Sequence, residues 1–183
     1  MEPLLLHACC APCSAAVVEW LMNNGARPVL FFFNPNIAPA AEYERRAAEC
    51  ARHAASLGLK MIEGEYDHSR WLAAVAGLEG EPERGERCAR CFEVRLMATA
   101  RLAGELGIRR FATTLASSRW KSLAQIADAG GRAAGVFPGT FFWDKNWRAG
   151  GLSERRRALL AEHGFYNQTF CGCEFSRRKE ATS

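Results

Sequence analysis

Seven cysteines gather at three points that are far apart along the chain. They occur as Cys9-Cys10-x-x-Cys13, Cys88-x-x-Cys91 and Cys171-x-Cys173. Thiolates act as nucleophiles, redox groups and metal ligands, so a fold that unites these points can bind a metal or transfer electrons. The eighth cysteine, Cys50, lies inside a helical stretch, and we expect it to be a small buried apolar side chain.

Three chemistries compete for these cysteines. Cys10-Ala11-Pro12-Cys13 alone resembles a thioredoxin-type dithiol at the start of a helix. A structural zinc site usually takes two C-x₂₋₄-C pairs, and adjacent Cys9-Cys10 suits it poorly because successive side chains diverge on an extended backbone. Neighbouring thiolates reach different irons of one larger cluster more easily. The spacing therefore favours an iron–sulfur cluster over zinc.

A [4Fe–4S] cluster needs four cysteines, which leaves three of the seven. The surplus can hold a second metal or form a reducible pair. Cys171-Gly172-Cys173 suits the second role, because a disulfide that closes over one glycine is strained and easily reduced.

The rest of the composition is that of an ordinary globular domain. The chain has 183 residues, of which 49% are hydrophobic and 24% charged, and its net charge is +4. A mildly basic chain permits a polyanionic partner without requiring one. Because the start of the sequence carries Glu2 and only three consecutive leucines, we expect no export signal and no membrane span. We therefore expect a protein of the reducing cytoplasm, where cysteines are more often ligands or redox groups than structural bridges.

Short apolar runs alternate with amphipathic stretches along the chain. This pattern predicts strands at 3–8, 28–33, 59–63, 109–114 and 136–142, and helices at 14–24, 39–57, 68–75, 88–106, 118–134 and 153–163. Such alternation is typical of a single α/β domain with a parallel sheet flanked by helices. We expect this domain to cover residues 1–176 and a flexible tail to cover 177–183.

The candidate residues fall at one edge of the predicted sheet. In such sheets ligands bind outside the carboxyl ends of the strands, where the strand order reverses. Cys9 follows the first strand and Thr113-Thr114 ends the fourth, so both are expected at that edge. Neither a G-x-x-x-x-G-K-[ST] nor a G-x-G-x-x-G motif is present, so the sequence supports no ATP or dinucleotide site.

An ordered series of short motifs runs through nearly the whole chain. It comprises Leu6-His7-Ala8-Cys9-Cys10-Ala11-Pro12, Phe33-Asn34-Pro35-Asn36-Ile37, Glu42-Tyr43-x-x-Arg46, Arg87-Cys88-x-x-Cys91, Thr113-Thr114-Leu115 and Tyr166-x-Gln168-x-x-Cys171-Gly172-Cys173-x-Phe175-Ser176. Single motifs of this kind are weakly specific, but the ordered set resembles the cobalamin-independent epoxyqueuosine reductases, the QueH-type family. The resemblance covers about residues 4–176.

The resemblance implies a nucleotide-hydrolase-like α/β fold, of the HUP or PP-loop type with Rossmann-like topology. It also implies the last step of queuosine synthesis, in which an epoxide carried by tRNA is deoxygenated to an alkene. The implied cofactor is a [4Fe–4S] cluster, and the family allows an additional mononuclear iron beside it. The implied partners are a tRNA with a queuosine-family anticodon and an external electron donor.

The resemblance also gives roles to the cysteines. Four correspond by position to cluster ligands: Cys9, Cys10, Cys88 and Cys91. Cys171 and Cys173 correspond to a redox pair, although the family also allows these two to be shared between cluster and iron. Cys13 occupies a variable position, where a thiolate would change the charge and softness of a second metal site. All seven are therefore candidate metal ligands, with Cys13, Cys171 and Cys173 as catalytic candidates.

Deoxygenation also requires an acid and contacts to the substrate. The candidate acids are Glu42, Tyr43 and Asp144, and each is equally consistent with a surface or capping role. Cations and aromatic rings interleave over 119–121 and 143–148, which suits the phosphates and flipped bases of an anticodon loop. About half of these tryptophans are equally expected in the core. The candidate substrate residues are Asn34, Asn36, Tyr43, Arg119, Lys121, Asp144 and Lys145.

The sequence thus predicts an oxidoreductase that acts on tRNA. Two other classes stay open: a zinc-stabilised RNA-binding module without catalytic activity, and a general dithiol oxidoreductase. Iron with sulfide distinguishes the enzyme from the module, which would hold zinc without sulfide.

Overall fold

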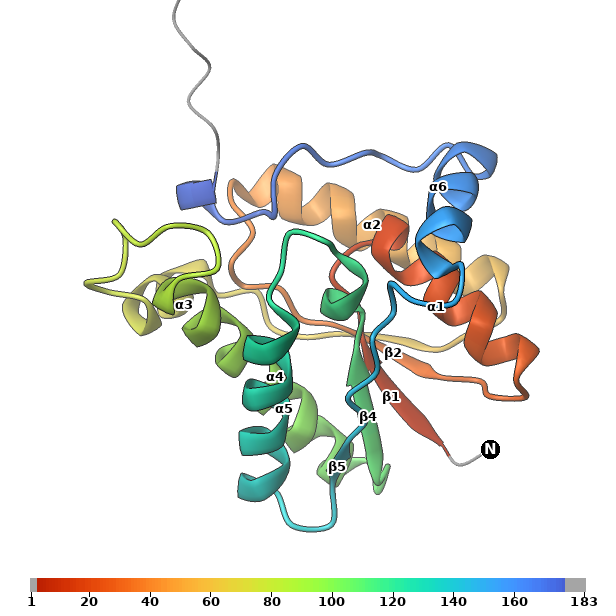
Figure 1. Ribbon diagram of the computed structural model, residues 1–183, viewed down its shortest axis with the longest axis horizontal. Coiled ribbons are helices and arrows are strands. Elements are labelled where there is room, and N and C mark those ends of the chain that lie inside the picture. Colours follow the sequence, from red (N-terminus) through yellow and green to blue (C-terminus); the bar gives the residue numbers. More distant parts are fainter. Residues whose placement is uncertain (1–2, 177–183) are drawn as a thin grey trace, which may run out of the picture.

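The computed structural model describes residues 3–176, which build one five-stranded parallel sheet flanked by helices (Figure 1). The strands are β1 (Leu4–His7), β2 (Val29–Phe32), β3 (Met61–Glu63), β4 (Arg110–Thr113) and β5 (Phe141–Phe142). Their order is β3-β2-β1-β4-β5, and all four pairings are parallel. The predicted α/β class is confirmed. The predicted tail at 177–183 lies outside the described residues.

Within residues 3–176, six α-helices lie in two groups around the sheet. They are α1 (Ala11–Asn23), α2 (Ala40–Ser56), α3 (His68–Ala74), α4 (Glu86–Glu105), α5 (Leu123–Val136) and α6 (Leu152–Glu162), with 3₁₀ turns η1 (Thr114–Ser117) and η2 (Glu174–Ser176). Helix α1 packs against α2 and α6, and α4 packs along α5 and against α3 (Figure 1). Over residues 3–176, no helix has the length and apolarity that crossing a bilayer requires.

The central strand β1 is apolar throughout because helices cover both faces of the sheet. Leu5 and Leu6 are fully buried, as is Phe111 on the neighbouring strand β4. Helix α1 follows β1 after a turn of only three residues and begins at Ala11, three residues earlier than predicted. Pro12 is compatible with this early start, since the first helical turn leaves backbone N–H groups without partners in any case.

The strand order reverses between β1 and β4. From β1 the chain crosses toward β2 and β3, whereas β4 and β5 lie on the other side. The two loops that leave β1 and β4 meet at this point: the Cys9 N–H donates to Thr114 Oγ1 at 3.2 Å. The first cysteine loop therefore lies at the switch point, outside the carboxyl ends of the strands.

Two predicted elements between 118 and 142 were wrong in extent. Helix α5 begins only at Leu123, where Ser122 caps it, and it continues through Gly130-Gly131 to Val136. A Cβ atom on Gly130 would lie 2.3 Å from the Phe142 ring. The glycine thus allows close packing against β5 and does not end the helix. The predicted strand at 136–142 is reduced to Phe141–Phe142, because α5 occupies its first residue and a turn at Gly139 follows.

Candidate metal and active site

Three buried thiols converge where β1 passes into α1. The sulfur atoms of Cys9, Cys10 and Cys13 all lie within 4.8 Å of one another, and the Cys9 and Cys10 sulfurs are 3.9 Å apart. Each side chain is at most 7% exposed. Three converging thiols of this kind, which we call the triad, can bind a metal.

The environment of the triad favours a thiolate at Cys9. Hydrogen bonds from the Cys10 and Cys13 thiols hold the pKa of Cys9 well below its usual value, and the charges of Lys121 and Arg95 act in the same direction. The Thr114 hydroxyl also donates to the Cys9 sulfur at 3.4 Å. The same hydrogen bonds, with burial, raise the pKa of Cys10. Such a site is prepared for a group that binds thiolates.

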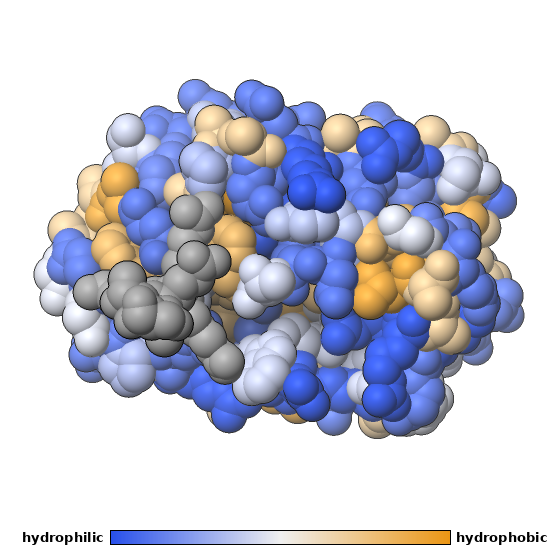
Figure 2. Space-filling view, turned by 90° about the horizontal axis from the view of Figure 1, so that it is seen from above, coloured by the Kyte–Doolittle hydropathy of each residue, from blue (hydrophilic) through white to orange (hydrophobic). Residues whose placement is uncertain are grey.

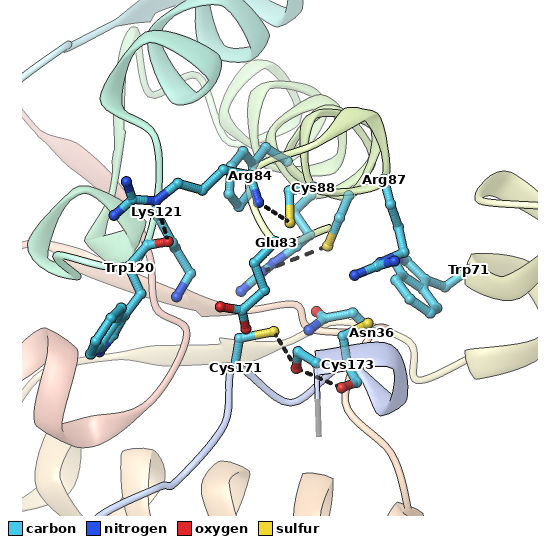
Figure 3. A pocket seen from close by; sticks show the side chains of 14 residues that line it. Asn36, Trp71, Glu83, Arg84, Arg87, Cys88, Trp120, Lys121, Cys171 and Cys173 are labelled. Atoms are coloured by element: carbon cyan, nitrogen blue, oxygen red, sulfur yellow. Dashed lines mark hydrogen bonds between the residues drawn. The ribbon is translucent and has the colours of Figure 1, made fainter. Parts of the chain in front are cut away.

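The other four cysteines line one pocket, with a cavity of about 40 Å³ (Figure 3). Cys88 and Cys91 come from the first two turns of α4, and Cys171 and Cys173 come from the C-terminal segment 165–176. In Figure 3 Cys88 approaches the pocket from one side, and Cys171 and Cys173 approach it from the opposite side. Cysteines that are at least 80 residues apart in the sequence therefore contribute thiols to one space.

Three of the residues that line this pocket have a buried polar atom without a hydrogen-bond partner among residues 3–176. These atoms are Asn36 Oδ1, Trp71 Nε1 and Arg95 Nε. Buried polar groups almost always find a partner, and exceptions point to a ligand or an ion. Together with the thiols, they fit a group that accepts hydrogen bonds and binds sulfur.

Lys121 connects the triad with the pocket. Its side chain lines the pocket between Trp120 and Glu83 (Figure 3). Burial opposes its charged form, but the sulfurs of Cys9, Cys13 and Cys171 outweigh this effect and raise the pKa of Lys121. A hydrogen bond from Cys173, followed by the charge of Lys121, in turn lowers the pKa of Cys171. One ammonium group therefore acts on both sets of cysteines.

Two further residues near the cysteines, His7 and Cys50, have structural roles. The ring nitrogens of His7 contact Thr113 Oγ1 at 2.8 Å and the Phe33 carbonyl at 3.1 Å. Burial, assisted by the charge of Arg95, lowers the pKa of His7 to about 3, so the ring is neutral. Cys50 is 2% exposed and belongs to a separate apolar cluster, which confirms its expected role as a small buried side chain.

Helix α2 holds the C-terminal segment against the site. Arg46, itself paired with Glu42 at 2.6 Å, donates to the carbonyls of Phe170 and Cys171, each at 3.2 Å. Gly172 has φ +110°, and a Cβ atom there would lie 2.8 Å from Ile37. The glycine between the last two cysteines is therefore required by backbone conformation and by space.

Some of the predicted substrate residues lie at the pocket. Asn36 and Lys121 line it directly. Asn34 contacts Arg95, which lines the pocket: the Asn34 Oδ1 accepts from Arg95, and its Nδ2 donates to the Ala8 carbonyl at 3.0 Å. Arg119 stands next to the pocket with its guanidinium carbon 4.5 Å from the Trp120 ring centre. Trp120 lines the pocket and is 56% exposed.

Other predicted residues are engaged elsewhere and do not line the pocket. Tyr43 donates to Glu63 at 2.8 Å, Glu42 pairs with Arg46, and Asp144 is exposed beyond β5.

The Lys145 ammonium lies over the rings of Trp20, Trp143 and Trp147. Trp147 is 1% exposed, so this part of the aromatic pattern belongs to the core.

The sequence did not reveal several residues of the site, among them Trp71, Glu83, Arg95 and Arg156. Arg95 follows Cys91 by four residues on α4, a spacing that places both on one face of the helix, and its Nη1 lies 3.9 Å from the Cys91 sulfur. Arg156 is hidden in the triplet Arg155-Arg156-Arg157, which reads as a solvated run of charge. Its Nη1 lies 3.9 Å from the Cys13 sulfur.

Comparison with known proteins finds relatives over nearly the whole chain. The family model described as epoxyqueuosine reductase QueH matches residues 4–179. Proteins named epoxyqueuosine reductase QueH are 42% identical in Acinetobacter baylyi (97% of this chain, 81% of the relative), 43% in Histophilus somni (96% and 72%) and 35% in Thermotoga maritima (96% and 91%).

A solved structure, a predicted subunit of tRNA methyltransferase from Methanocaldococcus jannaschii, has a TM-score of 0.57 over 88% of this chain and 75% of that one. At 17% identity this likeness bears on the fold alone. The sequence matches, in contrast, span nearly the whole chain at 35–43% identity. They show that this chain belongs to the epoxyqueuosine reductase QueH family of oxidoreductases.

Proposed function

We propose that this chain reduces epoxyqueuosine in tRNA to queuosine at an iron–sulfur centre held by cysteines of all three segments. The observation that carries the proposal is Lys121, which lines the pocket together with Cys171 and Cys173 and whose charge also acts on Cys9 and Cys13 of the triad. We assign the two cysteine groups to one site on this ground. Buried thiols with orphaned polar atoms beside them fit a metal–sulfur group in that site.

The ligands of a [4Fe–4S] cluster in this proposal are Cys9, Cys10, Cys88 and Cys91. Cys171 and Cys173 form the redox pair, which fits the different pKa directions of the two thiols, lowered for Cys171 and raised for Cys173. The proximity of Cys13 to Cys9 and Cys10 supports a role for Cys13 as a ligand, to the cluster or to an additional iron.

The chemistry breaks both C–O bonds of the epoxide, takes up two electrons and two protons, and releases the oxygen as water. When bound, the cluster supplies the electrons one at a time, from an external donor. Lys121 is placed to stabilise negative charge that develops on the departing oxygen. Glu83 is the carboxyl group among the lining residues and is the proposed route for protons.

The surroundings of the pocket suit a nucleic acid such as tRNA. A protein that modifies tRNA is expected in the cytoplasm. Trp120 offers an exposed ring on which a base of the anticodon loop can stack, with Arg119 beside it for a phosphate. The face seen from above in Figure 2 is mainly hydrophilic, with hydrophobic residues in small separate groups. Such a surface suits a polar partner.

The test is a count of iron and acid-labile sulfide in protein purified without oxygen, compared with Cys13→Ser and Cys50→Ser. We expect iron and sulfide in the unmodified protein and in Cys50→Ser, since Cys50 lies in the separate apolar cluster. Cys13→Ser should hold less iron and lose activity on tRNA. Zinc without sulfide in the unmodified protein would instead favour the RNA-binding module.

A further inference from the structure

Three consecutive arginines on α6 have different environments. Arg155 pairs with Glu19 and Glu162, each at 2.7 Å, and Arg157 pairs with Glu154 at 3.3 Å. Arg156, between them, is part-buried and donates toward the Cys13 sulfur. Residues 3–176 provide no carboxylate within ion-pair distance of it. The middle arginine is thus directed at the triad, whereas its neighbours bind carboxylates of the surface.

Arg95 makes the matching contact on the side of the pocket. It is 3% exposed, its Nη1 lies 3.9 Å from the Cys91 sulfur, and its Nη2 donates to Asn34 Oδ1. Its Nε has no hydrogen-bond partner among residues 3–176. Within the described part of the chain it forms no ion pair either. A buried guanidinium without a carboxylate partner is costly, so negative charge on the sulfurs of the site is needed to offset it.

On the basis of the proposed function, we propose that Arg156 and Arg95 are positioning residues that compensate the negative charge of the metal–sulfur centre from two sides. Four thiolates make a cluster anionic, and each added electron makes it more so. A fixed positive charge next to the ligand sulfur therefore stabilises the reduced state more than the oxidised state. The pair raises the reduction potential of the centre.

Arg156 allows the sharper test because its neighbour is a matched control. Arg156→Gln removes the charge, Arg156→Lys keeps it, and Arg157→Gln removes an exposed charge one residue further along the same helix. The measurements are iron and sulfide per chain and the midpoint potential of the centre, followed by its absorption spectrum. We expect a more negative potential in Arg156→Gln only, with Arg156→Lys and Arg157→Gln close to the unmodified protein.

Four outcomes decide the proposal. Failure of Arg156→Gln to retain iron, where Arg156→Lys retains it, also supports a charge effect. Equal potentials in Arg156→Gln and the unmodified protein overturn the proposal, as does an equal shift in Arg157→Gln. Weaker tRNA binding with unchanged potential overturns it in favour of a phosphate contact. Failure of the proposed function itself is distinguishable, because it appears as zinc or no metal in the unmodified protein.

Discussion

Trp120 and Trp147 have opposite environments although both stand between cations in the sequence. Trp120 is 56% exposed at the pocket, whereas Trp147 is 1% exposed among other aromatic rings. The local pattern left nucleic-acid contacts and core packing equally open for these tryptophans, since it contains no information on which ring faces the core. It proposed Lys121 as a substrate residue, and Lys121 lines the pocket, but the pattern did not indicate its position among sulfurs. Long-range packing decides which ring is buried and where Lys121 lies, and the local sequence does not reveal this packing.

At this scale we expect Trp120→Ala to weaken binding of an anticodon stem–loop by about 1–3 kcal/mol, the usual contribution of one stacked base. Trp120→Phe should retain most of the affinity because it keeps an aromatic face. The measurement is a fluorescence anisotropy titration. Val136→Ala is the control, since Val136 is similarly exposed, at 57%, and does not line the pocket. Equal affinities for Trp120→Ala and the control would exclude stacking on this ring.

Among the elements, α2 shows what the pattern of apolar and polar residues predicts and what it does not. Its apolar and polar residues predicted the helix nearly to its ends, but not what the polar face binds. Glu42, Arg46 and Glu49 follow one another at helical spacing, and all three contact the segment that carries the last cysteines. Those partners lie more than 115 residues further along the chain. Sequence proximity therefore gives no signal for the contact.

We expect Arg46→Met to destabilise the protein by about 3 kcal/mol, because it leaves the largely buried carboxylate of Glu42 without its partner. It should also release the backbone of Cys171 and speed the reaction of the metal-free protein with a thiol reagent. Urea unfolding and the rate of thiol modification measure the two effects. Arg52→Met, on the same helix with a side chain 72% exposed, should change stability by less than about 1 kcal/mol. Equal losses in both variants would contradict the anchoring role.

For the whole molecule, the alternation of strands and helices was sufficient to predict the fold class and the edge at which the site lies. The carboxyl ends of β1 and β4 and the start of α4 bring together cysteines that the sequence separates. The pattern did not reveal the grouping itself, with Cys13 beside Cys9 and Cys10 and the last two cysteines beside Cys88 and Cys91. This grouping depends on loop paths between strands, which periodicity does not encode.

The same arrangement predicts how the molecule meets its substrate. An exposed cation such as Arg119 next to the pocket would displace counterions from tRNA phosphates, so the affinity should fall steeply as salt rises. A plot of the logarithm of the binding constant against that of the salt concentration should be linear. Arg119→Gln should reduce its slope by about 0.7–0.9, the contribution of one phosphate contact.

Arg132→Gln serves as the control for this measurement, because Arg132 is exposed and paired with Asp128 at 2.8 Å on α5. Its slope should match that of the unmodified protein, since its charge is already balanced by a neighbour. Affinity that does not respond to salt would contradict an electrostatic docking surface. A phosphate bound at Arg119 makes the slope of Arg119→Gln differ from that of Arg132→Gln. A slope that falls equally in both variants would therefore show a diffuse effect of net charge.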